Sequence, residues 1–129
     1  MKLFDGVFQL LSRAIGLGWV RHGLIASNLA NAETPGFVPR DLDFRAELER
    51  AMGGGLRLVK THSLHLDPPG QGGPLVLEAP GDPGPDGNMV SLEREAVKLA
   101  QNQLLYNAFV RMLERRFEKL KYTISEGGR

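Results

Sequence analysis

Two histidines are the residues of this chain whose spacing could bind a metal ion. His62 and His65 lie three residues apart, and Asp67 is the nearest further ligand. A helix would place both imidazoles on one face, but Pro68 and Pro69 follow directly and oppose a helix at this point. A metal-dependent hydrolase is therefore only a remote interpretation, and we expect neither a metal site nor a cofactor.

Other reactive sites have no support in the sequence. The 129 residues include no cysteine, which excludes disulfides, thiolate metal sites and a cysteine nucleophile. The chain contains no Ser/His/Asp arrangement and no glycine-rich phosphate-binding pattern. Its carboxylates have the ordinary spacing of charge pairs on helix surfaces. We therefore expect a protein that is not an enzyme.

Composition limits the possible partners. The chain is 42% hydrophobic and 24% charged, an ordinary soluble balance, and its formal net charge of +1 gives no electrostatic case for nucleic acid. No apolar run reaches the eighteen residues or so that a membrane-spanning helix needs. The N-terminus also lacks a cleavable signal. We therefore expect neither direct insertion into a bilayer nor Sec-type secretion, although an uncleaved signal read by another export system would escape this test.

Residues 1–33 are predicted to form one long helix, because apolar residues recur at alternating steps of four and three. This spacing is typical of the seam of a helix that packs lengthwise against another. A second apolar row lies beside the seam, so we expect more than one helical neighbour. The seam consists of Phe4, Phe8, Leu11, Ile15, Gly18, His22, Ile25, Leu29 and Ala32.

The helix is predicted to end in a fixed turn. Thr34 precedes a proline and is pushed out of the helical region, and Pro35-Gly36 favours a type II turn. Asn28 and Asn31 fall in the last two helical turns, where short amides can bond freed carbonyls or a neighbouring chain. This pattern fits an ordinary helix stop with an aromatic residue beneath it, or a joint used in assembly. The residues of the proposed joint are Asn28, Asn31, Thr34, Pro35, Gly36 and Phe37.

The middle of the chain, residues 34–90, is predicted to hold the turn, a short helix and an irregular arm. The helix is expected over residues 40–52, with Asp41 or Asp43 near its start and glycines 53–55 at its end. Residues 56–61 could form a short strand or an extended arm. Residues 67–88 contain six prolines and six glycines, which oppose regular structure, and only residues 75–77 suggest a further strand.

Residues 91–126 are predicted to form the second long helix, with Ser91 as its N-cap. Gln103 is the only polar member of its seam and could fix the register or lie partly exposed. Five basic residues follow, but Glu114 and Glu118 lie among them, which favours a solvated face over a nucleic-acid site. The seam consists of Leu92, Ala96, Leu99, Gln103, Tyr106, Val110, Leu113, Phe117, Leu120 and Ile124.

Together these patterns predict a mostly all-α fold. The N- and C-terminal helices, residues 1–33 and 91–126, would pair as an antiparallel coiled coil and form one domain. Their apolar faces are wider than one pair of helices can bury. The sequence therefore indicates an assembly protein whose remaining apolar faces are covered by copies or relatives of itself.

Residues 27–37, Ser-Asn-Leu-Ala-Asn-Ala-Glu-Thr-Pro-Gly-Phe, resemble the signature of the flagellar rod, hook and hook-associated axial family. In that family the signature ends the N-terminal helix. Ser91 stands where the family often has aspartate, and Pro39 is unusual after the turn. Further residues resemble the proximal-rod members of the family, namely Arg40-Asp41-Leu42-Asp43-Phe44, Thr61, His65, Asp86-Gly87-Asn88, Ala100-Gln101-Asn102 and Tyr106.

The resemblance implies a structural subunit of the flagellar basal body that polymerises into the proximal rod and serves motility. It also implies export by the flagellar type III apparatus without a cleaved signal, and a location in the periplasmic rod. The implied partners are copies of the chain, other rod subunits, the adaptor at the rod base and the type III export gate. Another axial rod subunit and a helical cytoplasmic export chaperone or adaptor are the alternatives.

Overall fold

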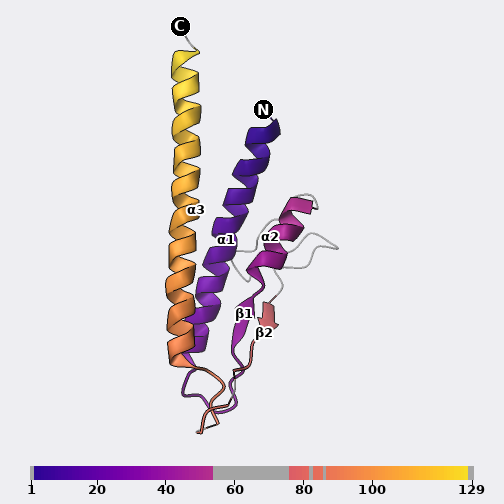
Figure 1. Cartoon of the computed structure of the whole chain (residues 1–129), viewed down its shortest axis with the longest axis vertical. Helices are drawn as coiled ribbons and strands as arrows, with labels where there is room; N and C mark the ends of the chain where they lie inside the picture. Colours follow the sequence, from indigo (N-terminus) through magenta and orange to yellow (C-terminus); the bar gives the residue numbers. More distant parts are fainter. Residues whose placement is uncertain (1, 54–75, 82, 86, 128–129) are drawn as a thin grey trace, which may run out of the picture.

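The computed structural model describes residues 2–53, 76–81, 83–85 and 87–127. In chain order, its elements are helix α1 (Lys2–Ala30), strand β1 (Arg40–Leu42), helix α2 (Phe44–Gly53), strand β2 (Val76–Glu78) and helix α3 (Leu92–Glu126) (Figure 1). The prediction of a mostly helical fold is confirmed. The segment 56–61, His62, His65 and Asp67 lie outside the described residues, so the expectations for them stay predictions.

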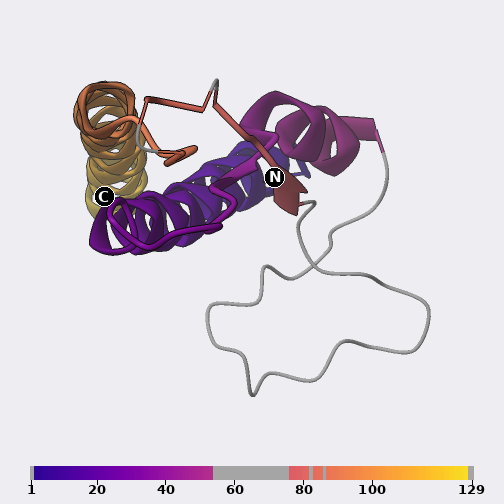
Figure 2. The ribbon, with the colours of Figure 1, turned by 90° about the horizontal axis from the view of Figure 1, so that it is seen from below.

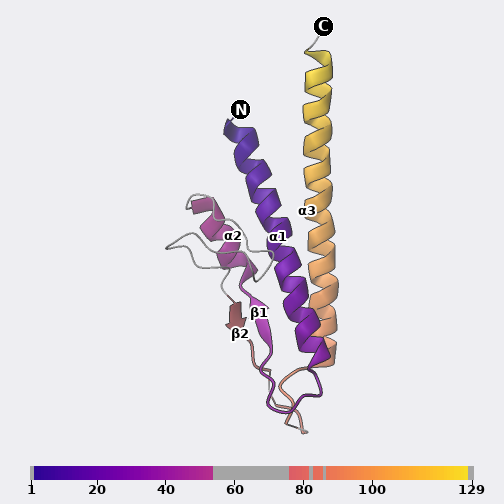
Figure 3. The ribbon, with the colours of Figure 1, turned by 180° about the vertical axis from the view of Figure 1, so that it is seen from behind.

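The two long helices run antiparallel, and α3 continues beyond the start of α1 (Figures 1 and 3). Near the loops, Asn28 of α1 bonds to Glu95 of α3. Toward the other end, the rings of Phe8 and Phe117 meet edge to face, with centroids 5.3 Å apart. The antiparallel side-by-side arrangement is thus present along the pair, whereas its coiled-coil character stays a prediction.

Helix α1 is the centre of the molecule. Helix α3 packs along one side of it, and α2 and β1 pack on another (Figure 2). This arrangement explains its wide apolar surface, because the second helical neighbour is supplied by the same chain. The buried apolar residues are Leu11, Ala14, Leu17, Ile25, Ala32 and Leu42.

Helix α2 is attached to α1 by a buried ion pair. The carboxylate of Glu47 is fully buried; it receives a bond of 2.9 Å from Arg50 of its own helix and lies 3.8 Å from Arg13 of α1. Phe44 stacks on Phe109 of α3, with ring centroids 6.0 Å apart. The short helix therefore contacts both long helices.

The helix predicted over residues 40–52 was placed too early. Arg40–Leu42 form β1, which pairs antiparallel with β2 in the register Arg40 to Glu78 and Leu42 to Val76. Helix α2 starts only at Phe44, because the Asp43 carboxylate accepts the Ala46 N–H at 3.0 Å and caps the helix. The strand expected at residues 75–77 is present as Val76–Glu78.

The ends of the long helices differ slightly from the prediction. Helix α1 ends at Ala30, three residues before residue 33, because Asn31 and Ala32 enter a tighter turn in which the Ala32 N–H bonds to the Leu29 carbonyl. Helix α3 begins as predicted. The Ser91 hydroxyl accepts the Arg94 N–H at 3.4 Å as the N-cap.

The predicted seam of α3 lies slightly to one side of the face that meets α1. Leu92 and Phe117 are more than half exposed, whereas Glu95 and Asn102 are buried. Gln103 is exposed and bonds to Asn107 of its own helix, so the partly exposed alternative is correct. The seam residues that face α1 and are partly buried are Leu99, Tyr106, Val110, Leu113 and Leu120.

Candidate assembly joint

The turn after α1 has the backbone geometry of a type II turn. The Phe37 N–H bonds to the Thr34 carbonyl at 3.3 Å, and Gly36 has a φ of 75°. Thr34, Pro35 and Gly36 are exposed, whereas Phe37 is partly buried. The sequence Thr34-Pro35-Gly36-Phe37 thus sets the direction in which the chain leaves the helix.

Asn31, the first residue after α1, closes the end of the helix. Its amide Nδ2 donates to the Ser27 carbonyl at 2.9 Å, and its Oδ1 accepts from the Thr34 hydroxyl at 3.2 Å. The Thr34 N–H also bonds to the Asn31 carbonyl at 3.0 Å. These local bonds satisfy groups that the end of a helix leaves free, and they join the helix end to the turn.

Replacing Gly36 with alanine is expected to destabilise the protein by about 1–2 kcal/mol, because a Cβ makes the left-handed backbone unfavourable. Nothing lies within 4 Å of the position that a Cβ would occupy, so the cost comes from the backbone alone. Urea unfolding measures the change. Gly36→Asn serves as the control, because asparagine tolerates this conformation and should lose clearly less stability. Equal losses in both variants would contradict the explanation.

Asn28 connects helix α1 to strand β1 and to helix α3. Its side chain is buried, with 1% exposed. Its Nδ2 donates to the Arg40 carbonyl at 2.8 Å, and its Oδ1 accepts the Arg40 N–H at 3.0 Å. The side-chain amide therefore pairs with the β1 backbone as a neighbouring strand would. The same Nδ2 donates to the Glu95 carboxylate at 2.9 Å, so one side chain links α1, β1 and α3.

Charged residues extend this connection. The Lys98 ammonium lies 2.8 Å from Glu95 and 3.5 Å from Asp41. Arg21 of α1 binds both carboxylate oxygens of Asp41, through Nε at 2.9 Å and through a terminal nitrogen at 3.1 Å. We call these connected residues the polar joint. Its members are Arg21, Asn28, Arg40, Asp41, Glu95 and Lys98.

The environment of Asp41 lowers its pKa. Burial opposes ionisation and acts to raise the pKa, but the hydrogen bonds from Arg21 and the Leu42 N–H, together with the charges of Arg21 and Lys98, outweigh it. The pKa of Asp41 therefore lies below the ordinary value of 3.8. The carboxylate is ionised at neutral pH and holds β1 against both long helices.

We expect the polar joint to lose stability in acid. Because the pKa of Asp41 is lower in the folded protein than in the unfolded chain, its contribution is fully present above the unfolded value of 3.8 and is lost as the pH falls through the folded value. The difference in unfolding free energy between the wild type and Asp41→Asn should therefore shrink between pH 6 and pH 3. Urea unfolding at several pH values checks this. A difference that stays constant over the range would contradict it.

A second buried amide joins the long helices nearer their middle. The Asn102 side chain, with 2% exposed, donates to the Gly18 carbonyl at 2.9 Å. A Cβ added to Gly18 would lie 3.3 Å from the Tyr106 ring. Glycine at this position lets the two helices approach closely enough for the amide bond to form.

The sequence pattern predicts only part of this arrangement. Asn31 bonds the Ser27 carbonyl at the helix end, as expected, whereas Asn28 bonds the Arg40 backbone and the Glu95 carboxylate instead of a carbonyl of its own helix. The roles of Arg21, Glu95 and Asn102 were missed, because a search for apolar periodicity passes over polar residues. The seven-residue spacing of Glu95 and Asn102, two turns on one helix face, is the signal that could have placed them at the interface.

The described residues lack two other features, a metal cluster and a membrane-spanning helix. Residues 2–53, 76–81, 83–85 and 87–127 contain no cluster of three potential metal-ligating His, Asp or Glu side chains. In the same part of the chain, no helix is apolar over a length that could span a membrane.

Comparison with known proteins gives consistent relatives. The chain is 32% identical over 134 residues to the flagellar basal body rod protein FlgB of Yersinia enterocolitica, covering 95% of this chain and 96% of the relative. It is 31% identical over 131 residues to FlgB of Bacillus subtilis, covering 100% of both chains. FlgB of Salmonella typhimurium is 35% identical over 111 residues, covering 79% of this chain and 80% of the relative. No protein-family model matches the chain.

Proposed function

This chain belongs to the FlgB family of flagellar basal body rod proteins, and we propose that α1 and α3 together form the surface through which it assembles. It is a structural subunit of the proximal rod. The proposal concerns how this subunit meets its neighbours, what holds its assembling helices in place, and which other proteins it contacts.

The observation that carries the proposal is the amount of apolar side chain left uncovered on α3. Leu104 is 72% exposed and Ile124 is 75% exposed. Large apolar side chains gathered along one helix mark an interaction surface more often than a surface left in water. The exposed large apolar residues of α3 are Leu92, Val97, Leu104, Leu105, Met112, Phe117, Tyr122 and Ile124.

The polar joint gives this surface a fixed shape. Asn28 binds the β1 backbone and α3 at once, and Arg21 binds Asp41 of β1. A polar network that is fully satisfied specifies one geometry, because any shift leaves buried groups unpaired. We infer that the joint keeps α1 and α3 in the arrangement that neighbouring subunits recognise. The turn residues Thr34–Phe37 then direct the rest of the chain away from the helix pair.

The partners inferred beyond the rod subunits are the adaptor at the rod base and the type III export gate, with export that needs no cleaved signal. Membership of the family and the uncovered helix surfaces support this inference. We also propose that the chain has no catalytic activity. The residues of the polar joint all take part in contacts that hold α1, β1 and α3 together, which supports a structural role.

Replacing Leu104 with lysine is expected to leave folding intact but to abolish incorporation into basal bodies. The side chain is 72% exposed, so unfolding free energy should change by no more than about 0.5 kcal/mol. Met52→Lys is the matched control, because Met52 is 74% exposed but lies on α2, outside the helix pair. Immunoblotting of purified basal bodies and a motility assay give the readouts. Incorporation of Leu104→Lys at the level of the control would refute the proposed surface.

A further inference from the structure

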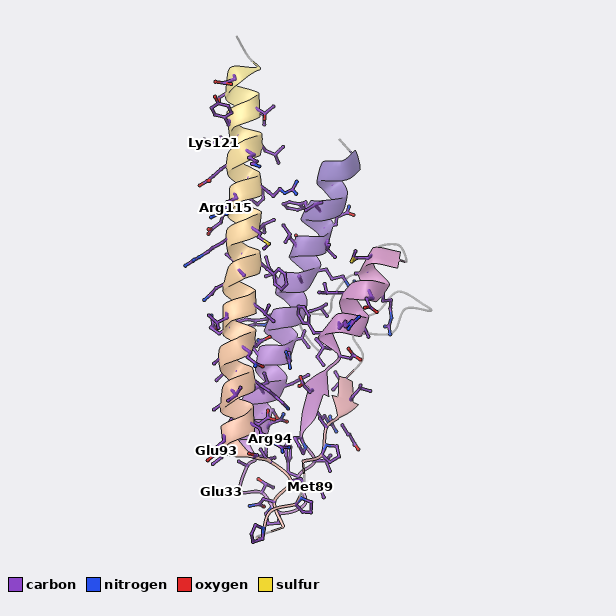
Figure 4. All side chains as sticks on the ribbon, viewed as in Figure 1. Glu33, Met89, Glu93, Arg94, Arg115 and Lys121 are labelled. Carbon is purple, nitrogen blue, oxygen red and sulfur yellow. The ribbon has the colours of Figure 1, made fainter. Side chains whose placement is uncertain are left out.

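A groove between the two long helices combines an apolar floor with a basic rim. Val7 and Leu11 of α1 and Met112 of α3 form the floor, beside a hollow of about 360 Å³. The rim consists of Arg115, Arg116 and Lys119 of α3. Figure 4 labels Arg115 on the upper half of α3.

The groove lies apart from the aromatic contact that joins the helices nearby. Met112 and Phe117 are five residues apart, which places them about 140° apart around a helix. Phe117 meets Phe8 on its side of the pair, whereas Met112 is half exposed on the side of the groove. In Figures 1 and 3 the two helices draw apart in this direction, toward the N-terminus of α1. Leu11 is buried, whereas Val7 is partly exposed and Met112 is half exposed, so the described part of the chain covers these two side chains only in part.

The charge of the rim restricts what can cover the floor. Arg115 and Lys119 are exposed and one helical turn apart, and neither has an ion-pair partner among the described residues. Two copies that met symmetrically through this groove would bring their basic rims together, since a two-fold contact uses the same patch on both subunits. Like charges at such a contact are unfavourable. The groove thus disfavours symmetric self-pairing and a basic partner.

We propose that this groove binds an acidic amphipathic helix of a different protein. Val7 and Leu11 lie one helical turn apart on α1 beside Met112 of α3, which suits the apolar stripe of a helix, and the basic rim suits carboxylates beside that stripe. The inference rests on the proposed function in one respect: the natural partner is taken to be another component of the rod or its base. The chemistry of the groove itself is tested without that assumption.

The first test measures binding in solution with the full chain. The probe is a synthetic helical peptide with leucines along one stripe and glutamates on its flanks, and the comparison peptide carries lysines in place of the glutamates. We expect fluorescence anisotropy to show binding of the glutamate peptide only, weakened about tenfold or more by the double substitution R115E/K119E and by added salt.

The matched control is R111E/K121E, which makes the same change of charge on the same helix at residues that do not line the groove. Binding of the glutamate peptide by this control should stay within about twofold of the wild type, because the rim is intact. Equal loss in both double variants, equal binding of the two peptides, or no binding of the glutamate peptide would overturn the proposal.

The second test identifies the occupant in the assembled structure. A photo-crosslinking amino acid replaces Met112 in the full chain, and the crosslinked segment in purified basal bodies is identified by mass spectrometry. Linkage to an acidic helix of another protein supports the proposal. Linkage to a second copy of this chain, to a segment without acidic residues, or to nothing in basal bodies that contain the chain overturns it. Absence of the chain from basal bodies would instead contradict the proposed function, and the peptide measurement would still decide the groove.

Discussion

Replacing Asn28 with aspartate is expected to destabilise the protein by about 2–5 kcal/mol, although the two side chains have nearly the same shape. The substitution removes the Nδ2 donor that now serves the Arg40 carbonyl at 2.8 Å and the Glu95 carboxylate at 2.9 Å. A buried group left without its hydrogen bond costs about 1–3 kcal/mol. The new carboxylate also faces Glu95, adding like-charge repulsion in a buried place. Urea unfolding at neutral pH measures the loss.

A second substitution tests whether the loss of stability comes from the bond between residues 28 and 95 or from an unspecific disturbance of the packing. In the double variant N28D/E95Q, the amide of residue 95 can donate to the carboxylate of residue 28, which reverses the bond between α1 and α3. We expect this pair to recover about 1–2 kcal/mol relative to the sum of the single losses, whereas the Arg40 carbonyl still lacks its donor. Asn31→Asp is the control, since Asn31 bonds within its own helix end and should cost about 1 kcal/mol or less. Simple additivity of N28D and E95Q would argue against a direct bond.

A leucine at Gly18 is expected to destabilise the protein by about 1–3 kcal/mol or more, because the larger side chain would force α1 and α3 apart. The Cβ alone would already lie 3.3 Å from Tyr106 Cδ2, and the Asn102 bond to the Gly18 carbonyl depends on this close approach. Urea unfolding measures the effect.

Gly23 supplies a matched control for this prediction. It lies on the same helix, is exposed, and has nothing within 4 Å of its Cβ position. Leucine or alanine there should stabilise α1 by up to about 1 kcal/mol, because glycine is a poor helix former. If leucine changed the stability equally at residues 18 and 23, close packing against Tyr106 would not explain the glycine at residue 18.

The elements that could be predicted from the sequence are those whose causes are local. The two long helices follow from apolar residues that recur at alternating steps of four and three over most of their length, and Ser91 marks the start of α3 through its own hydroxyl. The turn after α1 follows from the chemistry of Pro35-Gly36, since glycine readily adopts the positive φ observed at Gly36. No information from distant parts of the chain is needed for any of these.

The strand β1 could not be predicted in the same way. Arg40-Asp41-Leu42 fits a helix as well as a strand when considered alone. It is extended because Val76–Glu78 pairs with it across a long separation in sequence, and because Asn28 bonds its backbone from α1. Both partners come close to residues 40–42 only in the folded chain. Tertiary contacts therefore decided an element too short for its own residues to determine.

The polar joint could be predicted only in part, because it too depends on contacts between residues far apart in the sequence. An amide near a helix end has free carbonyls within reach, which makes Asn28 a candidate from the sequence. Asn28 does bind a carbonyl, but it is that of Arg40 in β1 rather than one in its own helix. Glu95 and Asn102 are buried at an interface where the apolar pattern predicted leucines and alanines. A polar residue is stable there only with a partner, and partners on another helix cannot be read from spacing alone.

Cryo-electron microscopy of intact basal bodies containing this chain tests whether α1 and α3 form the assembly surface. We expect density for the chain in the proximal rod, with α1 and α3 packed against neighbouring subunits and with Leu104 and Phe117 of α3, both more than half exposed in the single chain, buried at those contacts. A rod in which the chain is absent, or in which α3 faces solvent while α2 meets the neighbouring subunits, would contradict it.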